Sequence, residues 1–291
     1  METTLRSTEL NGISISYLEK GEGKLLLFLH GFPDNAFTFQ NQVDFFADRG
    51  YKVIAPFMRG YFPTTIPQDE KYYSVSLGKD IIELIKFFGN EKAIIVGHDW
   101  GATAAYAASI MNNERIEKLV AVSVPRGTFS KALITNSCQQ RKSWYIYFFQ
   151  TRLAEHAISY NDFDFIKLIW HEWGAKKWEI PVSHLENVIK MFKKEGVSKA
   201  AINYYRCFFD TSKLSVNESE LLKKVSEEKI KVPTLYLHGS EDGCIGSELC
   251  DGTESFFDCN YEKKIIEGAG HFIHLEEPQK FNDIILSFIE K

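Results

Sequence analysis

The stretch Gly97-His98-Asp99-Trp100-Gly101 decides how the rest of this chain is interpreted. It lies between an apolar run, residues 93–96, and a run of mostly small residues, 102–111, that is typical of a helix. A glycine, a reactive side chain two residues later and a second glycine two residues after that, at a turn from strand to helix, form a nucleophile elbow. Because such a turn lifts its central side chain above the sheet, the sequence predicts Asp99 as a nucleophile.

An aspartate in this position narrows the chemistry. A serine that attacked a saturated carbon would form an ether, which water does not readily cleave. A carboxylate forms an ester instead, and water can attack the ester carbonyl and regenerate the aspartate. Asp99 therefore indicates displacement at an sp3 carbon, with an epoxide oxygen or a halide as the departing group. A chance turn would also explain the motif, since Asp and Gly favour turns. Other motifs in the chain must therefore distinguish a nucleophile elbow from an ordinary turn.

Length, charge and hydropathy limit the class of protein. A chain of 291 residues can bury a full core and fits one α/β domain with an insertion. The formal net charge of −5 gives no reason to expect nucleic acid as a partner. The segment 1–12 has no apolar core of the kind found in signal peptides, and no uncharged apolar stretch is long enough to cross a bilayer. We therefore expect a cytoplasmic protein.

The five cysteines form no CxxC pair, and three of them fall between residues 244 and 259. This cluster raises the question of a metal or a disulfide. Because tight ligand spacing and a clustered histidine are missing, the sequence favours reduced thiols and no metal. The five are Cys138, Cys207, Cys244, Cys250 and Cys259.

Short apolar runs alternate with helical patterns, which predicts an α/β fold with a mostly parallel, doubly wound sheet. An alternating antiparallel strand is expected first, at 13–17. The helical patterns lie at about 37–49, 75–88, 102–111 and 278–291. The apolar runs lie at 25–29, 53–55, 93–96, 119–124, 234–237 and 263–266.

The alternation stops between residues 127 and 229, where helix formers and aromatic residues are frequent and no strand pattern stands out. A segment of this length is too long for an ordinary connection, so we expect a helical cap packed over the catalytic end of the sheet. The predicted division is a first core part at 1–126, a cap at 127–230 and a second core part at 231–291. Most of the cap aromatics are expected to pack the cap, and a minority to face a cavity.

His30-Gly31-Phe32-Pro33-Asp34 follows the first central strand, where folds with such an elbow build an oxyanion hole. The backbone N–H of Phe32 would act there together with that of Trp100. A plain helix-capping turn is the alternative, and Asp99 favours the oxyanion hole. His30 itself is expected to bond to loop backbone rather than to act as a base.

His271 is the predicted base, because it follows Gly268-Ala269-Gly270 on a loop after the last strand that can reach the elbow. His274 is its rival but lies closer to the C-terminal helix. The acid that orients the imidazole is expected after the strand at 234–237, at Asp242, with Glu241 as the rival. The chain order of nucleophile, acid and histidine is that of the α/β-hydrolases.

Together these motifs resemble the epoxide hydrolases of the α/β-hydrolase superfamily along nearly the whole chain. The matching stretches are HGFPD at His30–Asp34, RGY at Arg59–Tyr61, GHDWGA at Gly97–Ala102, Asp242 and GAGH at Gly268–His271. The resemblance implies an α/β-hydrolase fold with a helical cap, a small lipophilic epoxide as substrate, no cofactor or metal, and a monomer or homodimer. Phe57 and Phe62 depart from it, since the family often has Asp and Gly there.

In this family a pair of cap tyrosines hydrogen-bonds the epoxide oxygen. The resemblance points to Tyr145 in the first tyrosine segment and Tyr205 in the second, with Tyr147 and Tyr204 as alternatives. Trp100, beside the nucleophile, is expected to line the substrate site with them. Phenols suit this role because they donate hydrogen bonds without bringing charge into an apolar cavity.

The resulting hypothesis is hydrolysis of an epoxide to a vicinal diol through an ester on Asp99, which water activated by His271 and Asp242 then cleaves. A haloalkane dehalogenase is the first alternative, although Phe32 stands where such enzymes often carry Asn. Haloacetate dehalogenases would want arginines near the nucleophile, where Trp100 and Ala102 stand. A non-catalytic binding protein on a hydrolase scaffold is the alternative from another class.

Overall fold

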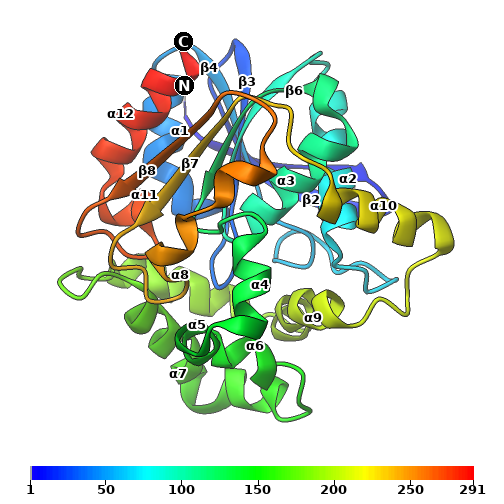
Figure 1. Cartoon of the computed structure of the whole chain (residues 1–291), viewed down its shortest axis with the longest axis vertical. Helices are drawn as coiled ribbons and strands as arrows, with labels where there is room; N and C mark the ends of the chain where they lie inside the picture. The colour runs from blue at the N-terminus through cyan, green and yellow to red at the C-terminus, as the bar shows by residue number, and fades with distance from the viewer. Residues whose placement is uncertain (1) are drawn as a thin grey trace.

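An eight-stranded sheet forms the centre of the structure, a computed structural model that describes residues 2–291 (Figure 1). The strand order is β1-β2-β4-β3-β5-β6-β7-β8, and every pair is parallel except β1 with β2 and β2 with β4. The predicted α/β fold with a mostly parallel sheet is confirmed. The strands are β1 (Thr4–Leu10), β2 (Ile13–Lys20), β3 (Lys24–Leu29), β4 (Tyr51–Pro56), β5 (Ala93–His98), β6 (Ile116–Val122), β7 (Thr234–Gly239) and β8 (Tyr261–Ile266).

Helices cover both faces of this sheet, which explains why its central strands are continuous apolar runs. In β3 the side chains of Leu25, Leu27 and Leu29 pack into the cluster that includes α2 and α3, whereas Leu26 and Phe28 pack into the cluster with α1 and α12. The helices α1 and α12 lie on the opposite side from α2 and α3 in Figure 1. Their bounds are α1 (Gln40–Ala47), α2 (Ser74–Phe87), α3 (Trp100–Met111) and α12 (Pro278–Ile289).

Two expectations about elements need correction. The helix expected at 37–49 is a 3-10 turn, Ala36–Phe39, followed by the shorter α1, because Asn35 caps the turn by accepting from the backbone N–H of Phe37. The strand β1 is not among the predicted elements. Its residues are mostly exposed, so backbone pairing with β2 holds it at the sheet edge, and no apolar pattern marks it.

Between β6 and β7 the chain is helical, and residues 127–229 hold no strand, as expected. Figure 1 shows most of these helices as a layer beyond one end of the sheet, while α10 lies beside α2 and α3. The carbonyl of Trp173, at the end of α7, accepts from the N–H of His271 and of Gly243, which ties this layer to two loops at the carboxyl end of the sheet. The helices are α4 (Thr128–Thr135), α5 (Ser137–Lys142), α6 (Trp144–Phe148), α7 (Ala154–Trp173), α8 (Val182–Phe192), α9 (Val197–Phe209) and α10 (Val216–Glu227). None of the helices described in residues 2–291 has the length and apolar character that a membrane crossing needs.

Candidate active site

Asp99 occupies a strained turn between β5 and α3. Its φ of 54° and ψ of −121° combine a positive φ with a strongly negative ψ, a conformation that a non-glycine residue adopts only when its surroundings hold it there. A Cβ atom at Gly31 would collide with the Asp99 carboxylate, and one at Gly101 would collide with the Leu29 backbone. The two glycines therefore let the elbow close against β3.

The backbone N–H of Phe32 donates to Asp99 Oδ1 at 2.8 Å. The N–H of Trp100 lies in the same corner, beside Gly31. The structure thus brings both residues of the predicted oxyanion hole to the Asp99 carboxylate. His30 bonds to loop backbone, as expected, because its Nε2 accepts from the N–H of Met58 and its Nδ1 lies 3.0 Å from the Gly31 carbonyl.

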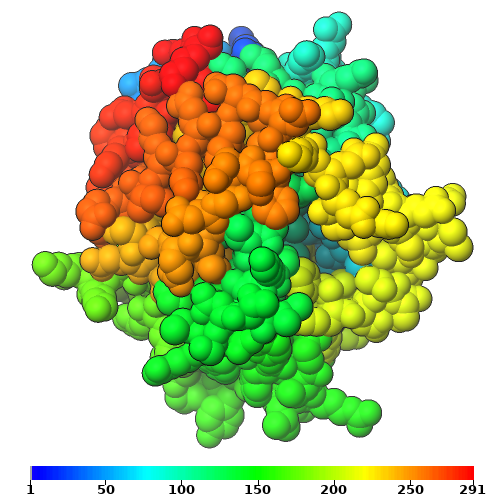
Figure 2. Space-filling view, in the orientation of Figure 1, coloured from blue at the N-terminus to red at the C-terminus, as the bar shows by residue number. Residues whose placement is uncertain are grey.

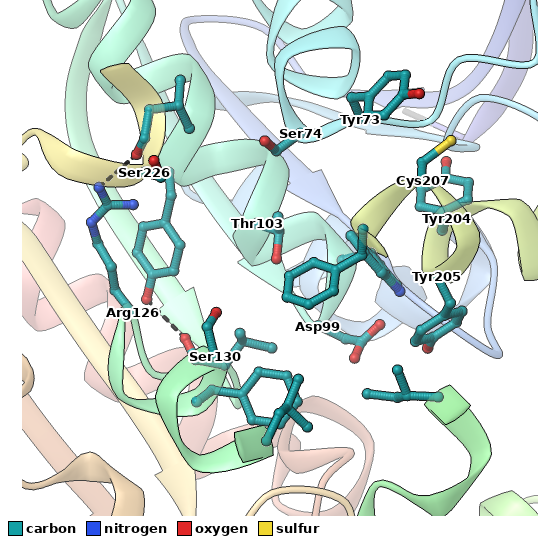
Figure 3. Close-up of a pocket in the computed structure, with 18 of the residues that line it drawn as sticks. Tyr73, Ser74, Asp99, Thr103, Arg126, Ser130, Tyr204, Tyr205, Cys207 and Ser226 are labelled. Atoms are coloured by element: carbon teal, nitrogen blue, oxygen red, sulfur yellow. Dashed lines mark hydrogen bonds between the residues drawn. The ribbon is translucent and has the colours of Figure 1, made fainter. Parts of the chain in front are cut away.

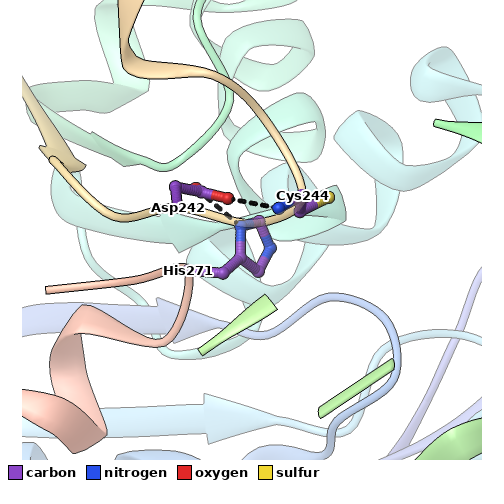
Figure 4. A group of neighbouring side chains, drawn as sticks. All are labelled: Asp242, Cys244 and His271. Carbon is purple, nitrogen blue, oxygen red and sulfur yellow. Dashed lines mark hydrogen bonds and ion pairs between the residues drawn. The ribbon is translucent and has the colours of Figure 1, made fainter. Parts of the chain in front are cut away.

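His271 lies between two carboxylates. Its Nε2 is 3.5 Å from Asp99 Oδ2. Its Nδ1 is 2.9 Å from Asp242 Oδ2, and Figure 4 shows this second contact. The imidazole is fully buried. Burial favours the neutral ring, but the two carboxylates outweigh it and raise the pKa of His271 to about 10.

The position of Asp242 is fixed by the turn that follows β7. Its Oδ1 accepts from the N–H of Cys244 at 2.7 Å and of Ile245 at 2.8 Å, which leaves Oδ2 for His271. Burial would raise the pKa of Asp242, but His271 holds it below the ordinary value. The rival Glu241 is exposed and accepts instead from the backbone of Lys176.

The rival base His274 points away from Asp99. Its Nε2 lies 2.7 Å from Thr38 Oγ1, and its ring packs against Phe39. His98, inside the elbow motif, bonds the backbone, since its Nε2 lies 2.9 Å from the His271 carbonyl. The structure therefore places His271 and not His274 at the elbow.

Glu276 is a residue that the sequence analysis missed. Its Oε2 accepts from the N–H of Gly270 at 2.6 Å and of Ala175 at 3.2 Å, and its Oε1 accepts from the N–H of Phe272 at 2.9 Å. The carboxylate therefore holds the backbone on both sides of His271. In the sequence, Glu276 could be recognised only by its short distance from His271. The adjacent Glu277 lies at nearly the same distance, so the sequence does not distinguish the two.

The two predicted tyrosines face each other, with ring centroids 5.5 Å apart. The Tyr145 hydroxyl lies 3.4 Å from Cys244 Sγ. The Tyr205 hydroxyl is buried and has no hydrogen-bond partner among the described residues. Burial raises the pKa of both phenols well above 10, so both stay protonated and can donate. The Trp100 ring packs edge-on against Tyr205.

The alternative tyrosines are engaged elsewhere. The hydroxyl of Tyr147 donates to the Leu133 carbonyl at 2.6 Å, and the residue is 40% exposed. The hydroxyl of Tyr204 donates to the Arg59 carbonyl at 2.8 Å. Neither hydroxyl is free for a ligand, so the geometry favours Tyr145 and Tyr205.

A cavity of about 450 Å3 extends from the Asp99 carboxylate to the hydroxyls of Tyr145 and Tyr205. Asp99, Trp100, Tyr145 and Tyr205 line it together with apolar side chains of α4, α9 and α10 (Figure 3). In the space-filling view a recess opens between the green segment of α4 and the yellow segments of α9 and α10 (Figure 2). A small molecule that enters there can reach the Asp99 carboxylate.

Asp242, Cys244 and His271 bring three possible metal-ligand atoms within 4.8 Å of one another. The donor set fits a metal poorly. The Asp242 carboxylate and the His271 Nδ1 already bond each other, and burial raises the pKa of the Cys244 thiol well above its ordinary value. A metal binds the thiolate and not the thiol. All five cysteines are free of disulfides.

The sheet, the elbow and the two loops beside it are those of a hydrolase. A family model described as alpha/beta hydrolase fold matches residues 24–278, and the chain belongs to this family.

Relatives named epoxide hydrolase match the chain along almost all of its length. Epoxide hydrolase 1 of Caenorhabditis elegans is 31% identical over 98% of this chain and 70% of that protein. The AB hydrolase superfamily protein YfhM of Bacillus subtilis is 32% identical over 96% of each. The crystal structure of an epoxide hydrolase from Bacillus megaterium superposes with a TM-score of 0.86 at 27% identity, over 98% of this chain and 100% of that one. The chain is thus a hydrolase-fold enzyme similar to epoxide hydrolases.

Proposed function

We propose that this protein hydrolyses a lipophilic epoxide to a vicinal diol through a covalent ester on Asp99. One observation carries the proposal: two protonated tyrosine hydroxyls, one of them with no hydrogen-bond partner in residues 2–291, line the same cavity as the elbow carboxylate. A halide leaves without needing a proton, whereas an epoxide oxygen needs one. The names of the relatives and of the solved structures support the same activity.

In the first step Tyr145 and Tyr205 hold the epoxide oxygen while Asp99 attacks a ring carbon from the opposite side. Asp99 Oδ1 accepts from the N–H of Phe32, whereas Oδ2 lies 3.5 Å from His271 Nε2, so Oδ2 is the oxygen that attacks. A bond forms between this oxygen and the carbon, and the carbon–oxygen bond of the ring breaks. The opened oxygen takes a proton from a tyrosine.

In the second step water attacks the ester carbonyl of Asp99. His271 Nε2 takes the water proton, and the N–H groups of Phe32 and Trp100 stabilise the negative oxygen that forms. The ester no longer carries the charge of Asp99, which is one cause of the raised pKa of His271. Alkylation therefore lowers this pKa and prepares the imidazole to act as a base. The proton that His271 held at rest is then lost to solvent, and the tyrosinate regains one from solvent. Collapse of the intermediate breaks the ester carbon–oxygen bond, and the departing alkoxide takes the water-derived proton from His271 and leaves as the diol. The Asp99 carboxyl then gives its proton to His271, which restores the carboxylate and the resting imidazolium.

We also propose that residues 127–230 act as the cap that carries both tyrosines, on a core made of 1–126 and 231–291. Neither step requires a metal or an organic cofactor. The five free cysteines support a reducing, cytoplasmic location.

Trapping the ester tests this proposal. We expect His271→Gln to react with a styrene-type epoxide and to accumulate a protein whose mass has risen by that of the epoxide, because water is no longer activated. Digestion and mass spectrometry should place the added mass on the peptide with Asp99. The double variant Asp99→Asn/His271→Gln is the control and should gain no mass. An unmodified Asp99 peptide in His271→Gln would contradict the mechanism, and halide release from bromoalkanes without diol formation would favour dehalogenation.

A further inference from the structure

Arg126 is a buried cation in the wall of the same cavity. It stands in the loop between β6 and α4 and is 9% exposed. Figure 3 draws Arg126 and Ser226 on one side of the cavity, Tyr204 and Tyr205 on the other, and Asp99 between them. Neither proposed chemical step uses this arginine.

The guanidinium has no acidic partner. Its Nη2 donates to the carbonyls of Val225 at 2.8 Å and Glu228 at 2.7 Å, at the end of α10. Its Nε is buried without a partner, and in residues 2–291 no carboxylate oxygen lies within 4 Å of the group. Burial accordingly lowers the pKa of Arg126. The two carbonyls and the ring of Tyr106, whose centroid lies 5.6 Å from Cζ, stabilise the charge in part. They do not neutralise it as a carboxylate would, and an anionic ligand could supply that charge.

The surroundings of Arg126 give this end of the cavity a polar character. The side chains of Ser130 and Ser226 lie on the same side of the cavity as Arg126 in Figure 3, and Thr103 lines the middle of the cavity. Those of Ser130 and Thr103 make no hydrogen bond within the described chain. Apolar side chains, among them Phe129 and Leu222, also line the cavity. The cavity therefore combines a reactive group, an apolar wall and a cation, an arrangement that matches a ligand with an apolar chain and an anionic end.

We propose that Arg126 binds the carboxylate of the substrate, so that the preferred substrates are epoxides of carboxylic acids with an apolar chain between the two groups. This inference rests on the proposed function, which it deepens by naming the substrate class. The competing explanation is that Arg126 only holds the end of α10 against the loop after β6.

Two matched substrates test the inference: an epoxy fatty acid and its methyl ester. We expect the wild-type protein to turn over the acid with the higher kcat/KM, and the ratio of acid to ester to fall roughly 10- to 100-fold in Arg126→Met, as for loss of a charged hydrogen bond. Arg126→Lys keeps the charge and should retain part of the preference. Arg141→Met, at an exposed arginine of α5, is the matched control and should leave the ratio unchanged. An equal loss for acid and ester in Arg126→Met would assign the residue to the fold alone and overturn the inference.

A binding measurement separates this inference from the proposed function. Dodecanoate, which has no epoxide, should bind the wild-type protein at least 10-fold more tightly than dodecanamide, and Arg126→Met should remove the difference. Binding of this kind in a protein that forms no diol would refute the proposed function and keep the anion site. Diol formation with equal binding of the two ligands would refute the anion site alone.

Discussion

The Tyr205 hydroxyl is buried and donates to no acceptor in the described part of the chain, whereas the hydroxyl of its neighbour Tyr204 donates to the Arg59 carbonyl. A buried donor that bonds nothing is costly unless a ligand satisfies it. The hydrogen bonding of the two hydroxyls therefore distinguishes two adjacent tyrosines that the sequence alone does not distinguish. Tyr205 is therefore the residue whose hydroxyl is best placed to serve the substrate.

Removing this hydroxyl should reduce the stabilisation of the opened epoxide oxygen. We expect Tyr205→Phe to lower kcat/KM for an epoxide by about 100-fold, as for loss of one donor to a developing oxyanion. Tyr147→Phe is the matched control, because its hydroxyl bonds the Leu133 carbonyl and the residue is partly exposed. Steady-state rates of diol formation measure both variants. Equal losses in the two variants would remove the tyrosine pair from the mechanism.

Residues on loops after strands could be predicted from the sequence. Asp99, Asp242 and His271 each follow an apolar run, and parallel strands bring their carboxyl ends to one edge of the sheet. Arg126 also follows a strand, β6, but its role could not be predicted from that position, and neither could the role of Glu276. Their importance depends on where the side chain points, and neither a local pattern nor a spacing rule encodes that direction.

Among the elements, the loop that carries His271 depends on one carboxylate. Glu276 accepts three backbone N–H groups, from Gly270, Phe272 and Ala175, the last of which follows α7. A glycine-rich loop is flexible by itself, so these bonds give His271 a fixed position over the elbow. The same carboxylate joins the helical layer to the core.

Glu276→Gln should leave Asp99 reactive and slow the second step. A glutamine offers one acceptor oxygen, and its NH2 group would face an N–H donor, so the loop loses one or two bonds. We expect the ester on Asp99 to accumulate during turnover, with kcat about 10-fold lower, and the free energy of unfolding to fall by about 1–3 kcal/mol. Rapid-quench mass spectrometry follows the ester, and thermal denaturation follows stability.

Glu277→Gln provides the control for this substitution, since Glu277 is exposed and its side chain makes no hydrogen bond within residues 2–291. It should behave as the wild-type protein in both measurements. A loss of stability in Glu276→Gln without any accumulation of ester would limit Glu276 to a structural role.

At the scale of elements, the central strands and main helices could be predicted because burial on both faces leaves a continuous apolar pattern. The edge strands gave weaker signals. β1 is mostly exposed, and β8 begins two residues before the predicted run, with Ile266 as its one buried residue. Strand pairing, rather than burial, defines these elements.

In the whole molecule, a buried ion pair joins the helical layer to the core. His184 Nε2 on α8 lies 2.9 Å from Asp34 Oδ1, in the loop after β3. Beside it, Asn35 donates to Asn187 Oδ1 at 3.3 Å. Asp34 lies two residues after Phe32, whose N–H bonds Asp99. The ion pair therefore links the position of the helical layer to the geometry around the Asp99 carboxylate.

The strength of this pair depends on pH. Burial opposes the charge of His184, but Asp34 outweighs it and raises the pKa of His184 above its ordinary 6.5. The folded state therefore binds the proton more tightly than the unfolded state. The stabilisation is complete below about pH 6.5 and is lost as the pH rises through the folded-state pKa. Burial would raise the pKa of Asp34, but His184 outweighs it and holds this pKa below its ordinary value. The stabilisation that Asp34 contributes is therefore lost only as the pH falls into the acid range.

His184→Gln should therefore destabilise the protein more at pH 6 than at pH 8.5. Without the imidazolium, the buried Asp34 carboxylate keeps its charge and loses its counter-ion, which costs about 3 kcal/mol at the lower pH. At pH 8.5 the wild-type protein has itself lost part of this stabilisation, so the free energies of unfolding of the variant and the wild-type protein differ less. Urea denaturation at both pH values measures it, and His156→Gln, at an exposed histidine of α7, should show no such dependence. Equal destabilisation at the two pH values would mean that the packing of His184 against Trp170, rather than its charge, holds the layer to the core.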